Sequence, residues 1–321
     1  MSLRPSAALV AATAALVPLA SSASCGSAFC MVNTNWSVQG VWIEPGPRVD
    51  FRFEYIDQDQ PMSGSRRVGV GEIPAHHDEV KTINRNFFAT IDYGFSPEWG
   101  VSVVIPYVDR YHEHIHNHQG EQELETWDFH DPGDMRVTGR WQTAIASADM
   151  ARAGFAGLTF GLKLPTGKFD VTNADGEVAE RSLQPGTGTT DALLGAYYRQ
   201  ALPFAGSSWF VQAGAQLPLN TRDDYKPGNQ FGVDAGYRYD QTDRLAWMLQ
   251  LNYRYKTRDK GAEAEPEDSG GQAVTASPGM SFAFTPAVQG YVFVQLPIWQ
   301  YVNGVQLTAD WSIAAGVSAQ F

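Results

Sequence analysis

The sequence predicts an all-β protein: a transmembrane antiparallel up-and-down β-barrel of about twelve strands, of the outer-membrane type. Three observations predict this fold. Apolar and polar residues alternate in runs of about ten residues. The connections between these runs are alternately short and long, and the last run is an alternating apolar face that ends at the C-terminal Phe321.

The alternation is clearest in LAWMLQLNYRYKTRD, residues 245–259. Leu249 and Leu251 belong to an apolar face, while Gln250 and Arg254 belong to a polar face, which is the period of a half-buried strand. Strands of soluble proteins usually have about five or six residues, whereas an outer-membrane strand needs about 9 to 11. The run is therefore long enough to cross an outer membrane.

Similar runs predict the remaining strands in chain order. They cover residues 50–55, 83–93, 101–107, 135–145, 155–168, 192–202, 209–220, 231–241, 273–285, 290–301 and 307–321. With residues 245–259 they make about twelve strands, an even number, as bacterial single-chain barrels require. Aromatic residues near the expected strand ends fit the interfacial girdles of such barrels. These residues are Tyr93, Trp99, Tyr107, Trp141, Trp209, Tyr237, Tyr239, Tyr255, Trp299 and Trp311.

The expected connections differ systematically in length. The short ones lie near Ser96, Ser147, Pro203, Thr242 and Pro286, and the long polar ones cover residues 58–80, 112–134, 169–191, 221–230 and 260–272. Short periplasmic turns and long extracellular loops are typical of transmembrane barrels. The alternative is a secreted β-sandwich, which explains neither this asymmetry nor the strand length.

The N-terminus predicts export. Arg4 and the apolar stretch AALVAATAALVPLA precede small residues, so residues 1–23 are expected to be a signal peptide. A periplasmic segment, residues 24–48, and the barrel, residues 49–321, would follow. No later stretch has about 18 consecutive apolar residues, which excludes a transmembrane helix. We expect a disulfide between Cys25 and Cys30, and lipidation of Cys25 is the less favoured alternative.

The charge and the C-terminus indicate the partners. A net charge of −12 argues against nucleic acid. The alternating C-terminal run resembles the signature by which outer-membrane proteins are handed to the barrel-assembly machinery. The expected partners are therefore this machinery, outer-membrane lipid and lipopolysaccharide, and a small solute or metal ion.

Three stretches carry a family likeness: PGDMRVTGRWQ at residues 132–142, GLKLPTGKFD at 161–170 and LQPGTGTTDALLGAYY at 183–198. They resemble the outer-membrane barrel family associated with the meta-pathway of phenol degradation. The likeness extends over residues 50–321, although only these stretches are specific. The resemblance implies an outer-membrane channel or transporter and leaves its solute open.

Strand parity places charges of both signs in the lumen if the apolar faces point to lipid. Such charges either pair with each other and stiffen the wall or line a path for a polar solute, and both interpretations stay open. The predicted lumen residues are Arg52, Asp92, Arg136, Arg140, Lys163, Arg238, Arg254 and Lys256.

A histidine-rich stretch, YHEHIHNHQGE, covers residues 111–121 and places His112, His114, His116 and His118 at every second position. Even positions of the preceding strand face inward, so these side chains are expected at the channel mouth. Imidazole is a common ligand of transition metals, and His76, His77 or His130 would complete a site for a divalent ion. The alternative is a solvated or lipopolysaccharide-facing loop. No other cofactor is predicted.

The sequence thus predicts an outer-membrane channel or transporter for a small polar solute or ion, with a divalent transition metal as one candidate. The solute would pass a charged lumen with an acidic, histidine-rich mouth. A non-conducting barrel that acts as a binding or assembly partner is the first alternative, and a rim enzyme is the second. An enzyme is not expected, because no serine lies in a G-x-S-x-G context and PTGK at residues 165–168 lacks the phosphate-loop spacing.

Overall fold

A computed structural model describes residues 45–73, 78–118, 121–145, 154–204 and 206–321. The predicted signal peptide and the Cys25–Cys30 pair lie outside these residues. Regular structure in the described part consists of strands alone. None of it is a helix long and apolar enough to span a membrane.

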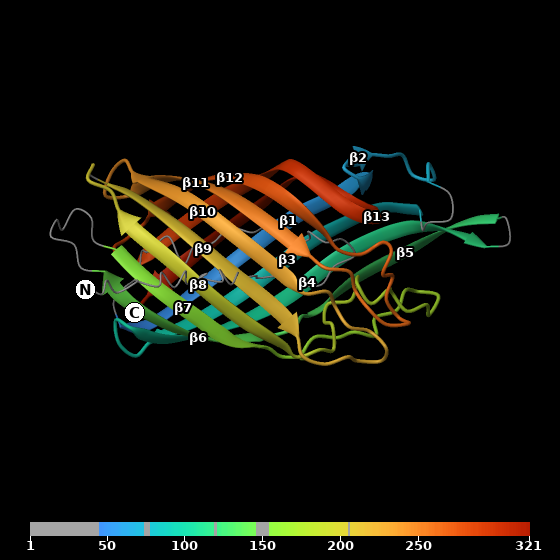
Figure 1. Cartoon of the computed structure of the whole chain (residues 1–321), viewed down its shortest axis with the longest axis horizontal. Helices are drawn as coiled ribbons and strands as arrows, with labels where there is room; N and C mark the ends of the chain where they lie inside the picture. Colours follow the sequence, from blue (N-terminus) through green and yellow to red (C-terminus); the bar gives the residue numbers. More distant parts are fainter. Residues whose placement is uncertain (1–44, 74–77, 119–120, 146–153, 205) are drawn as a thin grey trace, which may run out of the picture.

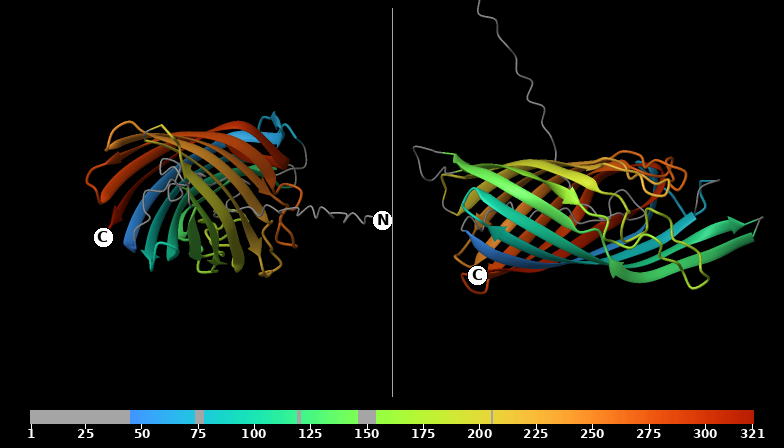
Figure 2. Two further views of the ribbon diagram at one scale, coloured as in Figure 1. Left: turned by 60° about the vertical axis from the view of Figure 1, so that its left-hand side comes forward. Right: turned by 90° about the horizontal axis from the view of Figure 1, so that it is seen from below.

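The strands form one antiparallel sheet that closes on itself (Figures 1 and 2). The ring runs in the order β13-β12-β11-β10-β9-β8-β7-β6-β4-β3-β1, and β13 pairs with β1 to close it. The short β2 and the longer β5 lie off this ring. The strands are β1 (Gly46–Gly64), β2 (Arg66–Arg67), β3 (Asp78–Gly94), β4 (Trp99–His118), β5 (Glu121–Pro132), β6 (Arg136–Ile145), β7 (Gly154–Lys163), β8 (Asp191–Ala201), β9 (Ser207–Pro218), β10 (Gln230–Asp240), β11 (Leu245–Lys256), β12 (Gly271–Ala283) and β13 (Val288–Gln320).

Strand β13 contributes two antiparallel passes to the barrel wall. Its 33 residues would span roughly 110 Å if they were fully extended. Its first part pairs with β12 and its second part with β1, while the amide of Gln320 donates to the carbonyl of Ala287 at 2.9 Å. The reversal falls at Gly304, whose φ of 58° is left-handed. The wall therefore has twelve passes, and the prediction of about twelve strands is confirmed.

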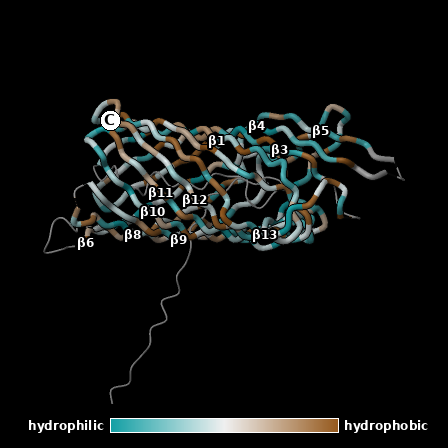
Figure 3. The backbone as a smooth tube through the Cα atoms, turned by 90° about the horizontal axis from the view of Figure 1, so that it is seen from above, coloured by the Kyte–Doolittle hydropathy of each residue, from teal (hydrophilic) through white to brown (hydrophobic). Residues whose placement is uncertain are grey.

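The two faces of the wall differ as the alternation predicts. Leu249 and Leu251 are about half exposed on the outer face, whereas Gln250 and Asn252 between and beside them are fully buried inside. Figure 3 shows the alternation of hydrophobic and hydrophilic residues along the barrel strands. Eight of the ten predicted girdle aromatics are exposed, and Trp141 and Trp209 are half-buried. An apolar belt with aromatic rims on a closed barrel makes this an outer-membrane β-barrel.

The expected long loop at residues 112–134 is largely a β-hairpin. Strand β4 pairs with β6 from Trp99 to Val104 and with β5 from Tyr107 to His118. The β4–β5 hairpin projects beyond the ring at the end away from the C-terminus (Figure 1). Polar composition alone suggested a loop here, but the two-residue period of β4 continues past the membrane and β5 satisfies its backbone groups.

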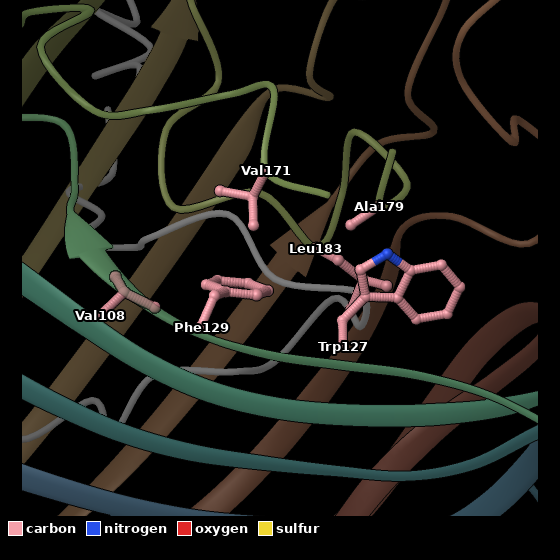
Figure 4. Close-up of a cluster of buried hydrophobic side chains, with 6 residues drawn as sticks. All are labelled: Val108, Trp127, Phe129, Val171, Ala179 and Leu183. Carbon is pink, nitrogen blue, oxygen red and sulfur yellow. The ribbon is translucent and has the colours of Figure 1, made fainter. Parts of the chain in front are cut away.

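The connection between β7 and β8, residues 164–190, packs against the inner face of this hairpin. Val171, Ala179 and Leu183 of the connection meet Val108, Trp127 and Phe129 in one buried cluster (Figure 4). Arg110 of β4 donates to the carbonyl oxygen of Leu183, and the Trp127 Nε1 donates to that of Glu177 at 3.1 Å. We call residues 164–190 the inner loop, because it is folded onto the mouth of the barrel.

Candidate functional site

The eight predicted lumen residues all lie on inward faces of their strands. Lys163 and Lys256 are buried, Arg136 is 9% exposed, and the other five are partly buried. Several of these charges have nearby partners: Arg52 binds Glu54 at 2.5 Å and Arg48 binds Asp92 at 2.8 Å. The lumen therefore combines a charged lining with ion pairs that stiffen the wall.

Asp134 is the centre of a buried polar cluster at the base of the inner loop. Its carboxylate accepts from Lys163 Nζ at 2.6 Å, from the Gly167 amide at 3.0 Å and from the Thr187 amide and hydroxyl, both at 2.9 Å. Lys163 also donates to the Thr189 carbonyl at 2.9 Å. Because hydrogen bonds to a buried charge are worth about 1.5–3 kcal/mol each, this cluster ties the inner loop to the ends of β6 and β7.

Close backbone contact accompanies these hydrogen bonds. A Cβ on Gly167 would lie 2.7 Å from the carbonyl carbon of Gly133 and 2.8 Å from the Cα of Gly186. The three glycines come from the three stretches that carried the family likeness, 132–142, 161–170 and 183–198. These three stretches therefore form one structural unit. The sequence marked them as typical of the family but did not indicate that they contact each other.

The mouth carries two further polar connections between loops. The Arg181 guanidinium of the inner loop lies 4.9 Å from the ring centre of Phe169 and 5.1 Å from that of Tyr225. Tyr225 donates to Asp259 at 3.0 Å, and Lys256 binds the same carboxylate at 2.9 Å. These contacts link the inner loop to two other connections at the mouth, residues 219–229 and residues 257–270.

The inward faces also hold aromatic side chains that the polar pattern did not predict. Cβ atoms on Gly236, Gly279 and Gly316 would lie 2.2–2.5 Å from ring atoms of Phe210, Phe293 and Tyr291. These rings therefore lie against the wall over a glycine of a neighbouring strand, an arrangement known to support glycines in barrels. The sequence signal was an aromatic residue on the polar face of a strand, cross-strand from a glycine.

Two of the candidate metal ligands, His112 and His114, form a buried hydrogen-bonded line. Thr82 Oγ1 lies 2.8 Å from His112 Nδ1, His112 Nε2 lies 3.2 Å from His114 Nδ1, and His114 Nε2 lies 3.0 Å from Glu125 Oε2. An ionised carboxylate only accepts hydrogen bonds, so each Nε2 donates toward Glu125 and each Nδ1 accepts. All four ring nitrogens are engaged in this line.

Burial keeps His112 uncharged. The residue lies beyond Tyr107, the last aromatic of the membrane belt on β4, and it is fully buried. Desolvation is the main reason that the pKa of His112 falls from 6.5 to about 3. The carboxylate of Glu180 raises this pKa, whereas the positive charge of Arg110 lowers it further. His112 is thus a neutral part of the hairpin core at physiological pH.

The other histidines of the predicted metal site are not brought to this line. His130 is exposed and lies beside Tyr107 with the ring centres 6.4 Å apart, on the opposite face of the hairpin from His112. The backbone of His116 and His118 continues β4, and His76 and His77 lie outside the described residues. Within the described ranges no group of three His, Cys, Asp or Glu side chains has metal-site geometry. Metal binding stays a prediction.

Comparison with known proteins places the fold. A crystal structure of the COG4313 outer-membrane channel from Pseudomonas putida F1 is similar with a TM-score of 0.65 and 12% identity, covering 87% of this chain and 96% of that one. The NanC porin gives a TM-score of 0.46 and 13% identity, covering 85% and 100%. No curated protein matches the sequence. The family model described as "Putative MetA-pathway of phenol degradation" matches residues 93–313, more than half of the chain, so the protein belongs to this family.

Proposed function

We propose that the protein is an outer-membrane channel through which small polar solutes diffuse passively. The main observation behind this proposal is the inward face of the closed barrel, which carries charged and amide side chains where the outer face carries apolar ones. Such a lining forms polar contacts with a solute that the surrounding lipid excludes. The similarity to an outer-membrane channel structure supports the fold on which this function rests.

The mouth sets the conditions of entry. The inner loop narrows it, and the loops around it contribute the acidic side chains Glu263, Glu267 and Asp268. Acidic mouths concentrate cations near the entrance, and the effect weakens as the salt concentration rises. Entry therefore depends on the ionic strength more strongly for cations than for neutral solutes.

The contacts of the described histidines give little support to a transition metal as the solute. The ring nitrogens of His112 and His114 are used within the hairpin, and His130 lies on its other face. A metal held at the mouth would need ligands from residues outside this line. Metal titration of a variant with His112, His114, His116 and His118 replaced by Ala remains the direct test of that candidate.

Conductance measurements separate the channel from a non-conducting barrel. The purified full chain is inserted into planar bilayers, and single-channel current is recorded in potassium chloride. We expect discrete current steps, together with swelling of proteoliposomes in small sugars or amino acids. Folded protein, judged by its heat-modifiable migration on gels, that gives neither current nor swelling would refute the proposed function and favour a binding or assembly role.

A further inference from the structure

Three glycines form a strip without side chains on the inner wall. Gly195 of β8 pairs with Gly214 of β9, and Gly214 pairs with Gly232 of β10. The next residue in this row is Arg254 of β11. The rows on either side carry Gln212 and Gln216, so amide groups border the strip along both edges. A row without side chains leaves room in the lumen for side chains that reach in from the opposite wall.

Arginines from two separate parts of the ring lie near this strip. Arg136 extends from β6, and its Nη2 lies 3.4 Å from Gln216 Oε1 on β9, two strands beyond its nearest neighbour in the ring. Arg254 of β11 lies in the row of the strip itself, cross-strand from Gly232. Both guanidinium groups are therefore next to the space that the glycines leave open.

The neighbouring carboxylates do not compete for the lumen space. Asp191 and Asp234 are fully buried. Gln216 and Thr189 donate to Asp191 at 2.6 and 2.7 Å, while Gln212 and Asn252 donate to Asp234 at 2.7 and 2.8 Å.

The arginines differ from these carboxylates in exposure. Arg136 keeps 9% of its surface exposed, and Arg254 is partly buried. The two arginine side chains beside the strip are therefore less completely buried than Asp191 and Asp234.

We propose that Arg136 and Arg254 form a binding site within the lumen for small solutes that carry a carboxylate. A guanidinium group matches a carboxylate with two parallel N–H donors. The site deepens the proposed channel function, on which it rests, by naming organic anions as the solute class.

Calorimetric titration of the full chain in detergent tests the site with acetate and its neutral isostere acetamide. We expect acetate to bind and acetamide not to bind. Arg136→Gln and Arg254→Gln should each weaken acetate binding by about tenfold or more, the loss of one charge-assisted contact. Arg199→Gln is the matched control, because Arg199 also faces inward on β8 but has its charged neighbours, Arg238 and Asp240, away from the cluster.

The outcomes distinguish the site from the channel. Equal binding of acetate and acetamide, or unchanged acetate affinity in both folded arginine variants, overturns the carboxylate site even if the barrel conducts. Acetate binding that both variants lose supports the site even if no current is observed, in which case only the channel function fails. Two variants are used so that misfolding of one, detected by heat-modifiable migration, leaves the other decisive.

Discussion

At the scale of single residues, two asparagines on the inward face of β3 differ in what they contact. Asn84 donates to Gln58 Oε1 at 2.8 Å and accepts from Arg110 Nε at 2.7 Å. Asn86 is 1% exposed, and neither atom of its amide has a partner among the described residues. The same residue type on the same face therefore has opposite energetic roles.

We expect Asn84→Leu to lower the free energy of unfolding by about 3 kcal/mol, because the buried Arg110 and Gln58 each lose one hydrogen-bond partner. Asn86→Leu should be neutral or stabilising by about 1 kcal/mol, since it removes an uncompensated amide. Urea unfolding in micelles, followed by tryptophan fluorescence, measures both. Equal destabilisation by the two substitutions would contradict the contacts seen here.

The hairpin core predicts a pH dependence through His112. Its pKa is lowered in the fold to about 3 from 6.5, so the unfolded hairpin binds more protons between these values. Stability carried by the neutral form is then complete above pH 6.5 and is lost as the pH falls toward 3. From pH 7 to pH 5 the loss amounts to about 2 kcal/mol.

Hydrogen exchange of the β4–β5 amides, corrected for the intrinsic pH dependence of exchange, measures this loss. Protection should fall from pH 7 to pH 5 in the natural protein and change less in His112→Gln, which cannot be protonated. Strands β9 and β10, which contain no histidine, serve as the internal reference. Constant protection of the hairpin across this range would show that His112 does not titrate as its burial implies.

At the scale of elements, the inner loop depends on the contact of three glycine backbones. Gly167→Ala would place a Cβ within 3 Å of backbone atoms of Gly133, Asp134 and Gly186, none of which can rotate away. We expect a loss of about 1–3 kcal/mol, typical of overpacking, and faster tryptic cleavage after Lys168. Gly69→Ala is the control, because its nearest neighbour is the flexible end of Glu72 at 3.8 Å. Cleavage at the same rate in both variants would argue against a tightly packed loop.

The strands were predictable from sequence to a different degree than the loops. The two-residue period of residues 245–259 identified the start and the buried face of β11, which ends at Lys256, because successive side chains of a regular strand point to opposite faces. The same rule did not stop at the membrane, so β4 and β5 form a hairpin where a polar loop was expected. The cluster around Asp134 joins residues distant in sequence, and no local period reports such a contact.

At the scale of the whole molecule, the inward direction of Arg136 and Arg254 followed from strand parity, but their convergence did not. Convergence depends on the closure of the ring and on the glycine strip of β8, β9 and β10, which is visible only once the register is known. The histidines show the reverse case. Their alternation placed His112 and His114 on the inward face, whereas Thr82, the partner of His112, and Glu125, the partner of His114, lie on other strands.

The inner loop sits on the mouth of the barrel and is held by Asp134, so releasing it should change flow through the whole molecule. Asp134→Ala removes four hydrogen bonds to the loop and to Lys163, and breaking a buried ion pair costs about 3–5 kcal/mol. We expect a larger single-channel conductance and faster tryptic cleavage of the loop. Asp131→Ala, which loses only a 3.7 Å contact with the exposed Lys168, should resemble the natural protein. If cleavage of Asp134→Ala accelerates while its conductance stays unchanged, the loop is released but the narrowest point lies deeper, at the arginines.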